Sequence, residues 1–226
     1  MSVADKILRF LSRLEPDVSP GDGIEVLNPY QDAATFALCR KFFKKYYDDM
    51  QRRILILGIN PGRHGAGLTG IPFTDPIKLN VICGIENSLH QKPELSADFI
   101  YAMIDAYGGP LAFYGHFYFS SVCPLGFTKD GRNLNYYDTR TLARTFRPFI
   151  VRSMRETMAI GMRTDICFCL GEGQNFKYLR QLNEEYGFFK RIIPLSHPRF
   201  IMQYRRKQLH SYINQYVDAF TGIAGN

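Results

Sequence analysis

Four side chains in this sequence could together hold a flat polar molecule and act on it. Asn60, Ser121 and His197 supply hydrogen-bond donors and acceptors, and Phe73 supplies a ring on which a planar group can stack. An enzyme that acts on a base of duplex nucleic acid extrudes that base into a pocket of this kind. When the bond between base and sugar breaks, negative charge develops on the departing base. A fixed donor such as His197 would stabilise that charge, and Asn60 could hold the attacking water or a base edge.

Each of these residues also has an ordinary structural interpretation. A histidine after a strand is more often structural than catalytic, and asparagine before proline is a common turn. Asn60 and Phe73, however, share one glycine-rich stretch, GINPGRHGAGLTGIPF (Gly58 to Phe73), in which the backbone can come close to a ligand. His64 in that stretch is an alternative base to His197, although its flexible setting makes it less suited to the role.

The same stretch gives only weak support for a phosphate-binding loop. Gly65-Ala66-Gly67-Leu68-Thr69-Gly70 fits the dinucleotide pattern G-x-G-x-x-G by letter, but no Gly-Lys-Ser/Thr is present for a P-loop. The segment lies well beyond the preceding apolar run, and Pro72 follows where a dinucleotide site would open its helix. Nucleotide binding is therefore a minor alternative.

The chemistry-bearing residues follow apolar runs that predict the strands of one sheet. Four such runs have strand length: Arg52–Ile59, His116–Leu125, Asp165–Gly171 and Arg191–Pro198. Runs that are apolar on both faces suit a parallel sheet covered by helices. Their alternation with helical patterns predicts an α/β fold, a three-layer α/β/α sandwich around a mostly parallel four-stranded sheet. Ligands of such sheets bind beyond the carboxyl ends of the strands, so the residues after the four runs should lie along one edge.

Helical spacing of apolar residues predicts the layers that cover this sheet. We expect an amphipathic helix at the N-terminus, a second from Gln31 to about Tyr47, one opened by Pro148, one from Gly173 to Tyr186 and a last one through Phe220. Residues 18–30 are expected to form a loop. Glycines at 126 and 131, with Asn133, indicate a surface loop after the second strand.

Composition indicates one globular domain, residues 1–226, with 46% apolar and 22% charged residues. Lys and Arg (28) exceed Asp and Glu (21), and the net charge of +7 suits a polyanion partner, with solvated helix faces as the alternative. Five scattered cysteines lack a C-x-x-C spacing, which indicates buried thiols and no metal site. No apolar run approaches the roughly 20 residues of a membrane helix, and no signal peptide is evident. We therefore expect no membrane association and a cytoplasmic protein, or a nuclear one in a eukaryote.

The glycine-rich stretch resembles the first motif of the single-strand-selective monofunctional uracil-DNA glycosylases, a family within the uracil-DNA glycosylase superfamily. CPLGF with GRNL (Cys123 to Leu134) is similar to the second segment of that family, and LSHP (Leu195 to Pro198) to the start of its third. The resemblance extends from about Ile54 to Lys207. The matching residues of the first motif are Gly58, Asn60, Pro61, Gly62, Thr69, Gly70, Pro72 and Phe73. The resemblance implies an α/β/α fold, as the apolar runs do.

The resemblance also implies roles for single residues. Asn60 would position the attacking water, His197 would stabilise the leaving base at a carbonyl oxygen, and Phe73 would stack on the flipped base. The backbone of Gly58, Ile59, Pro61 and Gly62 would line the base pocket together with Ser121. No lysine lies in a matching motif, so a Schiff-base lyase step is not indicated. The expected substrate is uracil-containing DNA, and the products are an abasic site and the free base. No metal or cofactor is implied, and we expect a monomer.

Two departures from the family pattern indicate a divergent second branch. Ser121 stands where the family has a base-reading asparagine, and a hydroxyl lacks the paired donor and acceptor of an amide. The pocket is therefore predicted to admit xanthine or hypoxanthine besides uracil. After His197-Pro198 the sequence departs from the family's DNA-penetrating segment. We expect the residues that replace it to contact DNA: Arg199, Phe200, Tyr204, Arg205 and Lys207. The alternative is that Phe200 and Ile201 anchor the last helix in the core. Alternative functions are a nucleoside or nucleotide N-glycosidic hydrolase and a non-catalytic nucleic-acid-binding module.

Overall fold

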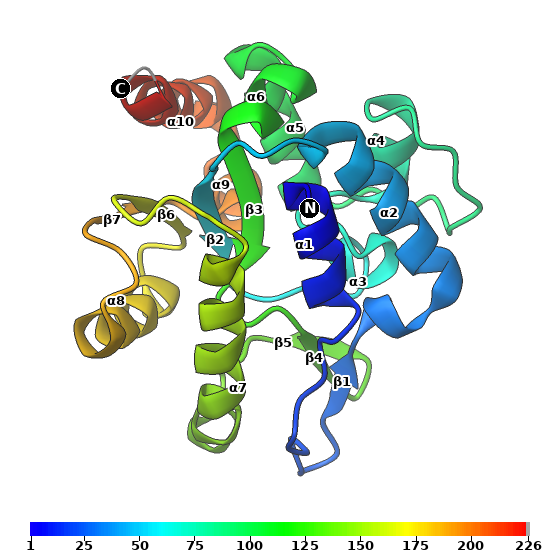
Figure 1. Ribbon diagram of the computed structural model, residues 1–226, viewed down its shortest axis with the longest axis vertical. Coiled ribbons are helices and arrows are strands. Elements are labelled where there is room, and N and C mark those ends of the chain that lie inside the picture. Colours follow the sequence, from blue (N-terminus) through cyan, green and yellow to red (C-terminus); the bar gives the residue numbers. More distant parts are fainter. Residues whose placement is uncertain (225–226) are drawn as a thin grey trace.

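The computed structural model describes residues 1–224, and it is built around a parallel sheet of four strands (Figure 1). The strands lie in the order β3-β2-β6-β7, and every neighbouring pair is parallel. Their bounds are β2 (Ile54–Gly58), β3 (Phe117–Ser121), β6 (Cys167–Leu170) and β7 (Ile192–Leu195). This arrangement confirms the predicted α/β fold with a parallel four-stranded sheet. Residues 225 and 226, which the single-domain prediction includes, lie outside the described residues.

Aromatic side chains on β3 show how the two faces of the sheet are covered. Phe117 packs on Phe220 with ring centroids 4.7 Å apart, whereas its neighbour Tyr118 packs on Tyr47 at 5.7 Å. Successive side chains of a strand point to opposite faces, so these contacts belong to different layers. One layer holds α10 (Leu209–Ala224), and the other holds α2 (Ala33–Tyr47). β2, β3 and β6 are therefore buried on both sides, as their apolar sequences predict, whereas the edge strand β7 is half-buried.

The remaining helices complete these layers and link the strands. α5 packs on α9 and α10, and α1 packs on α2. The pattern above did not predict α5, which supplies one wall of the site described below. Their bounds are α1 (Val3–Leu11), α3 (Ala66–Thr69), α4 (Pro76–Val81), α5 (Leu95–Tyr107), α6 (Pro110–His116), α8 (Gln174–Tyr186) and α9 (Pro198–Tyr204), with the short 3-10 helices η1 (Pro29–Gln31) and η2 (Arg206–Gln208).

A second, three-stranded antiparallel sheet corrects two loop predictions. β1 (Glu25–Leu27) lies within the predicted loop 18–30, and β4 (Gly126–Lys129) with β5 (Arg132–Leu134) replaces the predicted surface loop. Asp130 and Gly131 connect β4 to β5, and both have positive φ angles, of 49° and 69°. Asp-Gly with two such residues is the preferred two-residue hairpin turn, so a signal for this hairpin was present in the sequence. Figure 1 shows the small sheet beyond the arrowhead of β3.

The helix that Pro148 was expected to open begins earlier. α7 (Arg140–Ala159) contains Pro148 in its interior. Thr139 supplies the N-cap, because its hydroxyl accepts a hydrogen bond from the Leu142 amide at 3.1 Å. Proline lacks an amide proton and usually disturbs a helix interior. Here the cap and the buried inner face of α7 outweigh that cost, and the prediction was wrong about the start of the helix.

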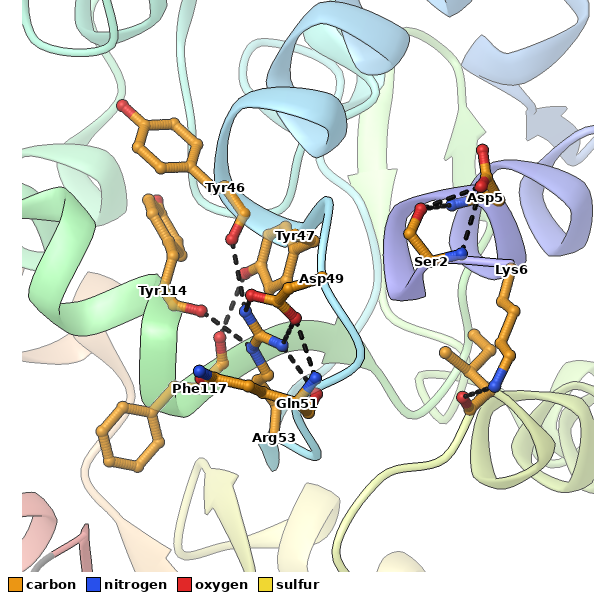
Figure 2. Close-up of polar contacts among 11 residues, drawn as sticks. Ser2, Asp5, Lys6, Tyr46, Tyr47, Asp49, Gln51, Arg53, Tyr114 and Phe117 are labelled. Carbon is orange, nitrogen blue, oxygen red and sulfur yellow. Dashed lines mark hydrogen bonds and ion pairs between the residues drawn. The ribbon is translucent and has the colours of Figure 1, made fainter.

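A buried arginine fixes the amino end of β2, at the sheet edge away from the strand exits. Figure 2 shows the guanidinium of Arg53 between Asp49 and several backbone carbonyls. Arg53 is 1% exposed, and it donates to the Tyr114 carbonyl at 3.1 Å and to Asp49 Oδ2 at 2.7 Å. Its guanidinium also lies over the ring of Tyr47 at 5.3 Å. A buried charge is tolerated only when it is paired and hydrogen-bonded in this way.

The state of the cysteines agrees with the expectation of buried thiols. All five cysteines are buried and free, and burial raises the pKa of Cys39, Cys123 and Cys169 to about 12. Within residues 1–224, no group of three or more His, Cys, Asp or Glu side chains is arranged to hold a metal ion. In the same part of the chain, no helix is both long enough and apolar enough to cross a bilayer.

Candidate active site

A cavity of about 420 Å³ opens at the carboxyl edge of the parallel sheet. Three strand exits reach it, those of β2, β3 and β7. The exit of β6 does not line it, and Glu172 there accepts a hydrogen bond from Ser196 at 2.6 Å instead. The residues predicted to bind or act on a base that line the cavity are Ile59, Asn60, Pro61, Gly62, Phe73, Ser121 and His197. Gly58 lies directly behind the cavity, against the ring of Phe73.

The side chain of Asn60 is held in one orientation by backbone groups. Its Oδ1 accepts a hydrogen bond from the Tyr136 amide at 3.0 Å, and its Nδ2 donates to the Leu134 carbonyl at 3.1 Å. A backbone amide can only donate and a carbonyl can only accept, so the positions of oxygen and nitrogen in the carboxamide are unambiguous. Oδ1 keeps a second lone pair, which can accept a proton of a water molecule.

Two buried residues that the sequence pattern did not single out support Asn60 from behind. The Tyr136 hydroxyl donates to Asn175 Oδ1 at 2.9 Å. Asn175 Nδ2 in turn donates to the carbonyls of Leu170 at 3.0 Å and Gly58 at 3.3 Å, which join the ends of β6 and β2. A sequence signal existed, because Asn175 occupies the inner stripe of α8, otherwise formed by Leu179 and Leu182. A polar residue at such a position requires buried partners.

His197 is a neutral imidazole whose tautomer is set by the backbone. It is the N-cap of α9, and its Nδ1 accepts a hydrogen bond from the Arg199 amide at 3.1 Å. Nδ1 therefore carries a lone pair, and the single proton of the neutral ring is on Nε2. Burial, with a smaller contribution from the Arg199 charge, lowers the pKa of His197 to about 4. His197 consequently presents a hydrogen-bond donor to the cavity near neutral pH without being charged.

Phe73 is held in a strained conformation over the end of β2. Its φ is 55°, which non-glycine residues rarely adopt. A Cβ added to Gly58 would lie 2.7 Å from Phe73 Cζ, so the ring packs on the bare backbone of β2. The buried hydroxyl of Thr69 closes the turn, since it donates to the Thr74 carbonyl at 2.7 Å and accepts from the Ile71 amide at 3.1 Å. Such strain is typical of functional sites. The ring centroid lies 6.2 Å from that of His197.

Ser121 and His64 also line the cavity. Ser121 ends β3, where it pairs with Gly58 in the parallel ladder and is partly buried. His64 lies at the mouth, and its Nε2 is 3.4 Å from Lys92 Nζ. Burial and the charge of Lys92 lower the pKa of His64. A backbone amide fixes the ring of His197, whereas the ring of His64 contacts the flexible side chain of Lys92. His197 is therefore the better-oriented group.

The segment after His197 forms one wall of the cavity. Arg199, Phe200 and Tyr204 line it, and the two aromatic side chains are 40% and 67% exposed. Ile201 is 0% exposed, so Ile201 anchors α9 in the core while Phe200 does not. The guanidinium of Arg205 covers the ring of Phe200 at 5.5 Å. Arg205 and Lys207 are exposed beyond the cavity and do not line it.

The lining of the cavity also includes a segment that was not predicted. Pro93, Glu94, Leu95 and Ser96, at the start of α5, contribute to the lining. Glu94 is the N-cap of α5, and its Oε2 accepts from the Ala97 amide at 3.0 Å. In the sequence these residues lie between two helices and do not follow a strand. The rule that ligands bind beyond the carboxyl ends of strands therefore could not find them.

Comparison with known proteins agrees with the geometry of the cavity. The family described as the Uracil DNA glycosylase superfamily matches residues 44–221. Among solved structures, the chain is similar to "The crystal structure of WT Pedobacter heparinus SMUG2", with 46% sequence identity, 100% of both chains covered and a TM-score of 0.97. A search of curated proteins found no match. The family match covers most of the chain and includes every candidate site residue. The chain therefore belongs to the uracil DNA glycosylase superfamily.

Proposed function

We propose that this protein is a monofunctional DNA glycosylase that hydrolyses the N-glycosidic bond of uracil in DNA and leaves an abasic site for base excision repair. Membership of the superfamily and the similarity to a SMUG2 structure support DNA glycosylase as the class of enzyme. One observation carries the assignment of roles: a backbone-oriented carboxamide, a neutral imidazole and a stacking ring border a single cavity.

The leaving base is stabilised by His197 in the proposed reaction. The flipped base lies on the ring of Phe73, out of the DNA stack. As the bond between the sugar C1′ and the base nitrogen breaks, its electron pair moves onto the base and negative charge reaches a carbonyl oxygen. The Nε2–H of His197 donates a hydrogen bond to that oxygen. A neutral imidazole stabilises the anion without having to transfer its proton.

The attacking water is held by Asn60. Oδ1 accepts one proton of the water, whose oxygen adds to C1′ of the oxocarbenium-like sugar and loses its other proton to solvent. A carboxamide is too weak a base to remove a proton, so Asn60 contributes position and orientation. No lysine participates, and the reaction ends at the abasic site. Support for this role is the fixed orientation of the carboxamide, with one acceptor position of Oδ1 left open.

The exposed face of α9 and the residues after it contact DNA in this proposal. Phe200 and Tyr204 enter the space that the flipped base vacates, and Arg199, Arg205 and Lys207 lie on phosphates. The two exposed rings lie together beside the cavity, with ring centroids 5.6 Å apart, and apolar groups that gather on a surface in this way mark interaction sites, which supports this role.

Ser121 broadens the range of bases in the same proposal. Its single hydroxyl cannot make the paired donor and acceptor contacts by which an amide selects uracil. Xanthine and hypoxanthine are therefore accepted as well. The variant Ser121→Asn should raise the ratio of the uracil rate to the xanthine and hypoxanthine rates. If the wild type removes uracil efficiently and neither of the other bases, broad selectivity is wrong.

A labelled oligonucleotide with one uracil tests the function. The wild type should leave an alkali-labile abasic site, in single- or double-stranded DNA. Asn60→Ala should slow cleavage by roughly 10²- to 10³-fold, in line with the loss of one oriented catalytic group, and still bind DNA. The control is Asn214→Ala, an exposed asparagine of α10, which should cleave like the wild type.

Other outcomes of the same assay identify other functions. A strand that is shifted in a gel but never cleaved would indicate a binding module. Hydrolysis of free deoxyuridine without cleavage of the oligonucleotide would indicate a nucleoside hydrolase. Full activity of Asn60→Ala would remove Asn60 from the mechanism.

A further inference from the structure

Three cations gather at the tip of the hairpin formed by β4 and β5. Lys129 and Arg132 are directly opposite each other in the antiparallel pair. Arg63, from the glycine-rich loop, joins them, because its Nη1 is 3.6 Å from the position of a Cβ added to Gly131. All three side chains belong to exposed residues. We refer to Arg63, Lys129 and Arg132 as the hairpin cations.

In the part of the chain that the structure describes, the hairpin cations are among the basic residues that have no carboxylate partner. Among residues 1–224, none of the three forms an ion pair, whereas Arg147, Arg152 and Arg163 each pair with a carboxylate. The acids near the tip are Asp130, in the turn itself, and Glu25, whose carboxylate accepts a hydrogen bond from Thr128. Like charges directly opposite on a hairpin destabilise it. A ligand that brings negative charge would remove this cost.

The hairpin is also fixed to the loop that carries Asn60. The Arg63 amide donates to Asn133 Oδ1 at 3.2 Å, and Leu134 of β5 accepts from the Asn60 side chain at 3.1 Å. At the base of the hairpin, a Cβ added to Gly126 would clash with the Pro61 carbonyl oxygen, so the two backbones are in close contact. An anion bound at the hairpin tip therefore has a set position relative to Asn60.

The hairpin and α9 form separate parts of the cavity wall. Asn133, Leu134 and Gly62 line the cavity from the hairpin and its loop, and Arg199 lines it from α9. Arg63 and Arg199 both contribute to lowering the pKa of His64 at the mouth, after the larger effects of burial and Lys92. Positive charge therefore acts on the mouth from both parts of the wall.

We propose that Arg63, Lys129 and Arg132 bind backbone phosphates of the strand that carries the flipped nucleotide, as a second DNA-binding element separate from α9. This inference rests on the proposed function for its substrate. Arginine guanidinium groups suit phosphate because their planar fork makes two parallel hydrogen bonds. Phosphate contacts carry no sequence information but fix the register of the strand. Two such elements hold the strand at separate points while the base is extruded between them.

The test measures how the affinity for a uracil-free single-stranded oligonucleotide depends on salt, by fluorescence anisotropy. Each phosphate contact contributes about 0.7 to the slope of log K against log salt for single strands. The triple variant Arg63→Gln, Lys129→Gln, Arg132→Gln should lower the magnitude of the slope by about 2, from three contacts. Each single variant should lower it by about 0.7. Glutamine keeps most of the side-chain length, and the single variants retain the test if the triple variant does not fold.

A matched triple variant controls for the loss of net charge. Arg52, Lys190 and Arg191 are exposed and lie next to the amino ends of β2 and β7, at the sheet edge opposite the cavity. Their replacement by glutamine removes the same charge and should leave the slope unchanged. Equal changes in the two triple variants, or no change in the hairpin variant, would overturn the proposal.

Failure of this inference is distinguishable from failure of the proposed function. Binding of uracil-free DNA requires no bond cleavage, and the uracil oligonucleotide reports cleavage separately. If the wild type cleaves uracil DNA and the slope is insensitive to the hairpin, the glycosylase stands and the second DNA-binding element does not. If the slope depends on the hairpin and uracil stays intact, the DNA-binding element stands and the glycosylase does not.

Discussion

Lowering the pH from 7 to 5 should destabilise the folded protein through His197. The pKa of His197 is lowered to about 4 by burial and by the charge of Arg199. In the unfolded chain a histidine titrates near its ordinary pKa of about 6.5. Between these values the unfolded chain binds a proton that folded His197 does not bind, so the free energy of unfolding decreases as the pH falls. Above the unfolded pKa both states are neutral, and this contribution is absent.

The size of the effect follows from the two pKa values. Linkage gives a loss of about 2 kcal/mol in the free energy of unfolding between pH 7 and pH 5. The loss reaches about 3 kcal/mol below pH 4, where both states are protonated. His197 is partly exposed to solvent through the cavity, and this solvent reduces the effect of burial on its pKa. Both free-energy values are therefore upper bounds.

Urea unfolding at pH 7 and pH 5 measures this contribution. His197→Gln cannot titrate, so its difference in stability between the two pH values should be about 2 kcal/mol smaller than that of the wild type. The control is His210→Gln, an exposed histidine of α10, which should keep the wild-type difference. A comparison between variants cancels the carboxylates that titrate in the same range.

The single-turnover rate on uracil DNA should agree with this result. If neutral His197 donates to the leaving base, the rate constant should be nearly flat from pH 8 to pH 6 and should fall as the pH approaches 4. A rate that rises as the pH falls through 6.5 would show that a protonated histidine is the active form. Equal pH dependence of stability in the wild type and in His197→Gln would refute the buried neutral imidazole itself.

Two substitutions test the groups that support the site. Gly58→Ala places a Cβ 2.7 Å from Phe73 Cζ and must displace the ring. The rate of uracil excision should therefore drop at least tenfold, with little change in affinity for uracil-free DNA. Wild-type kinetics in this variant would show that the position of the ring is not critical. Tyr136→Phe leaves Asn175 without its donor, which should cost about 1–3 kcal/mol of stability and also slow single-turnover cleavage. Tyr178→Phe removes the hydroxyl of the adjacent ring, which lies near Arg147 and makes no hydrogen bond of good geometry within residues 1–224. It should leave single-turnover cleavage unchanged, and equal slowing in the two variants would reduce Tyr136 to a packing residue.

The central sheet was predictable because three of its strands, β2, β3 and β6, are buried on both faces and the half-buried β7 is apolar as well. Such strands need continuous apolar runs, and β2, β3, β6 and β7 have them. β4 and β5 were not recognised because they are short and β5 is largely exposed, so their periodicity is weak; only the turn at Asp130 carried a signal. The start of α7 was misplaced because proline is read as a helix opener, whereas Thr139 caps the helix more than two turns before Pro148.

The site was predictable where its residues follow strands. Asn60, Ser121 and His197 reach one cavity because parallel strands end at one edge. Tyr136 and Asn175 could not be placed, because their contacts join segments far apart in the chain and depend on how α8 packs. The roles of the site residues in catalysis and in DNA binding stay predictions until the variants are measured.

The buried cysteines make the protein its own reporter of opening motions. The thiolate is the form of cysteine that attacks thiol reagents, and burial raises the pKa of Cys169 in β6 and of Cys123 after β3 to about 12. Labelling must therefore wait until the surrounding structure opens, and its rate measures how often it does. Cys39 reports on another region, because its thiol donates to the Thr69 carbonyl of the glycine-rich loop at 3.4 Å. The exchange kinetics of the sheet and of the glycine-rich loop can thus be followed by mass spectrometry without an introduced probe.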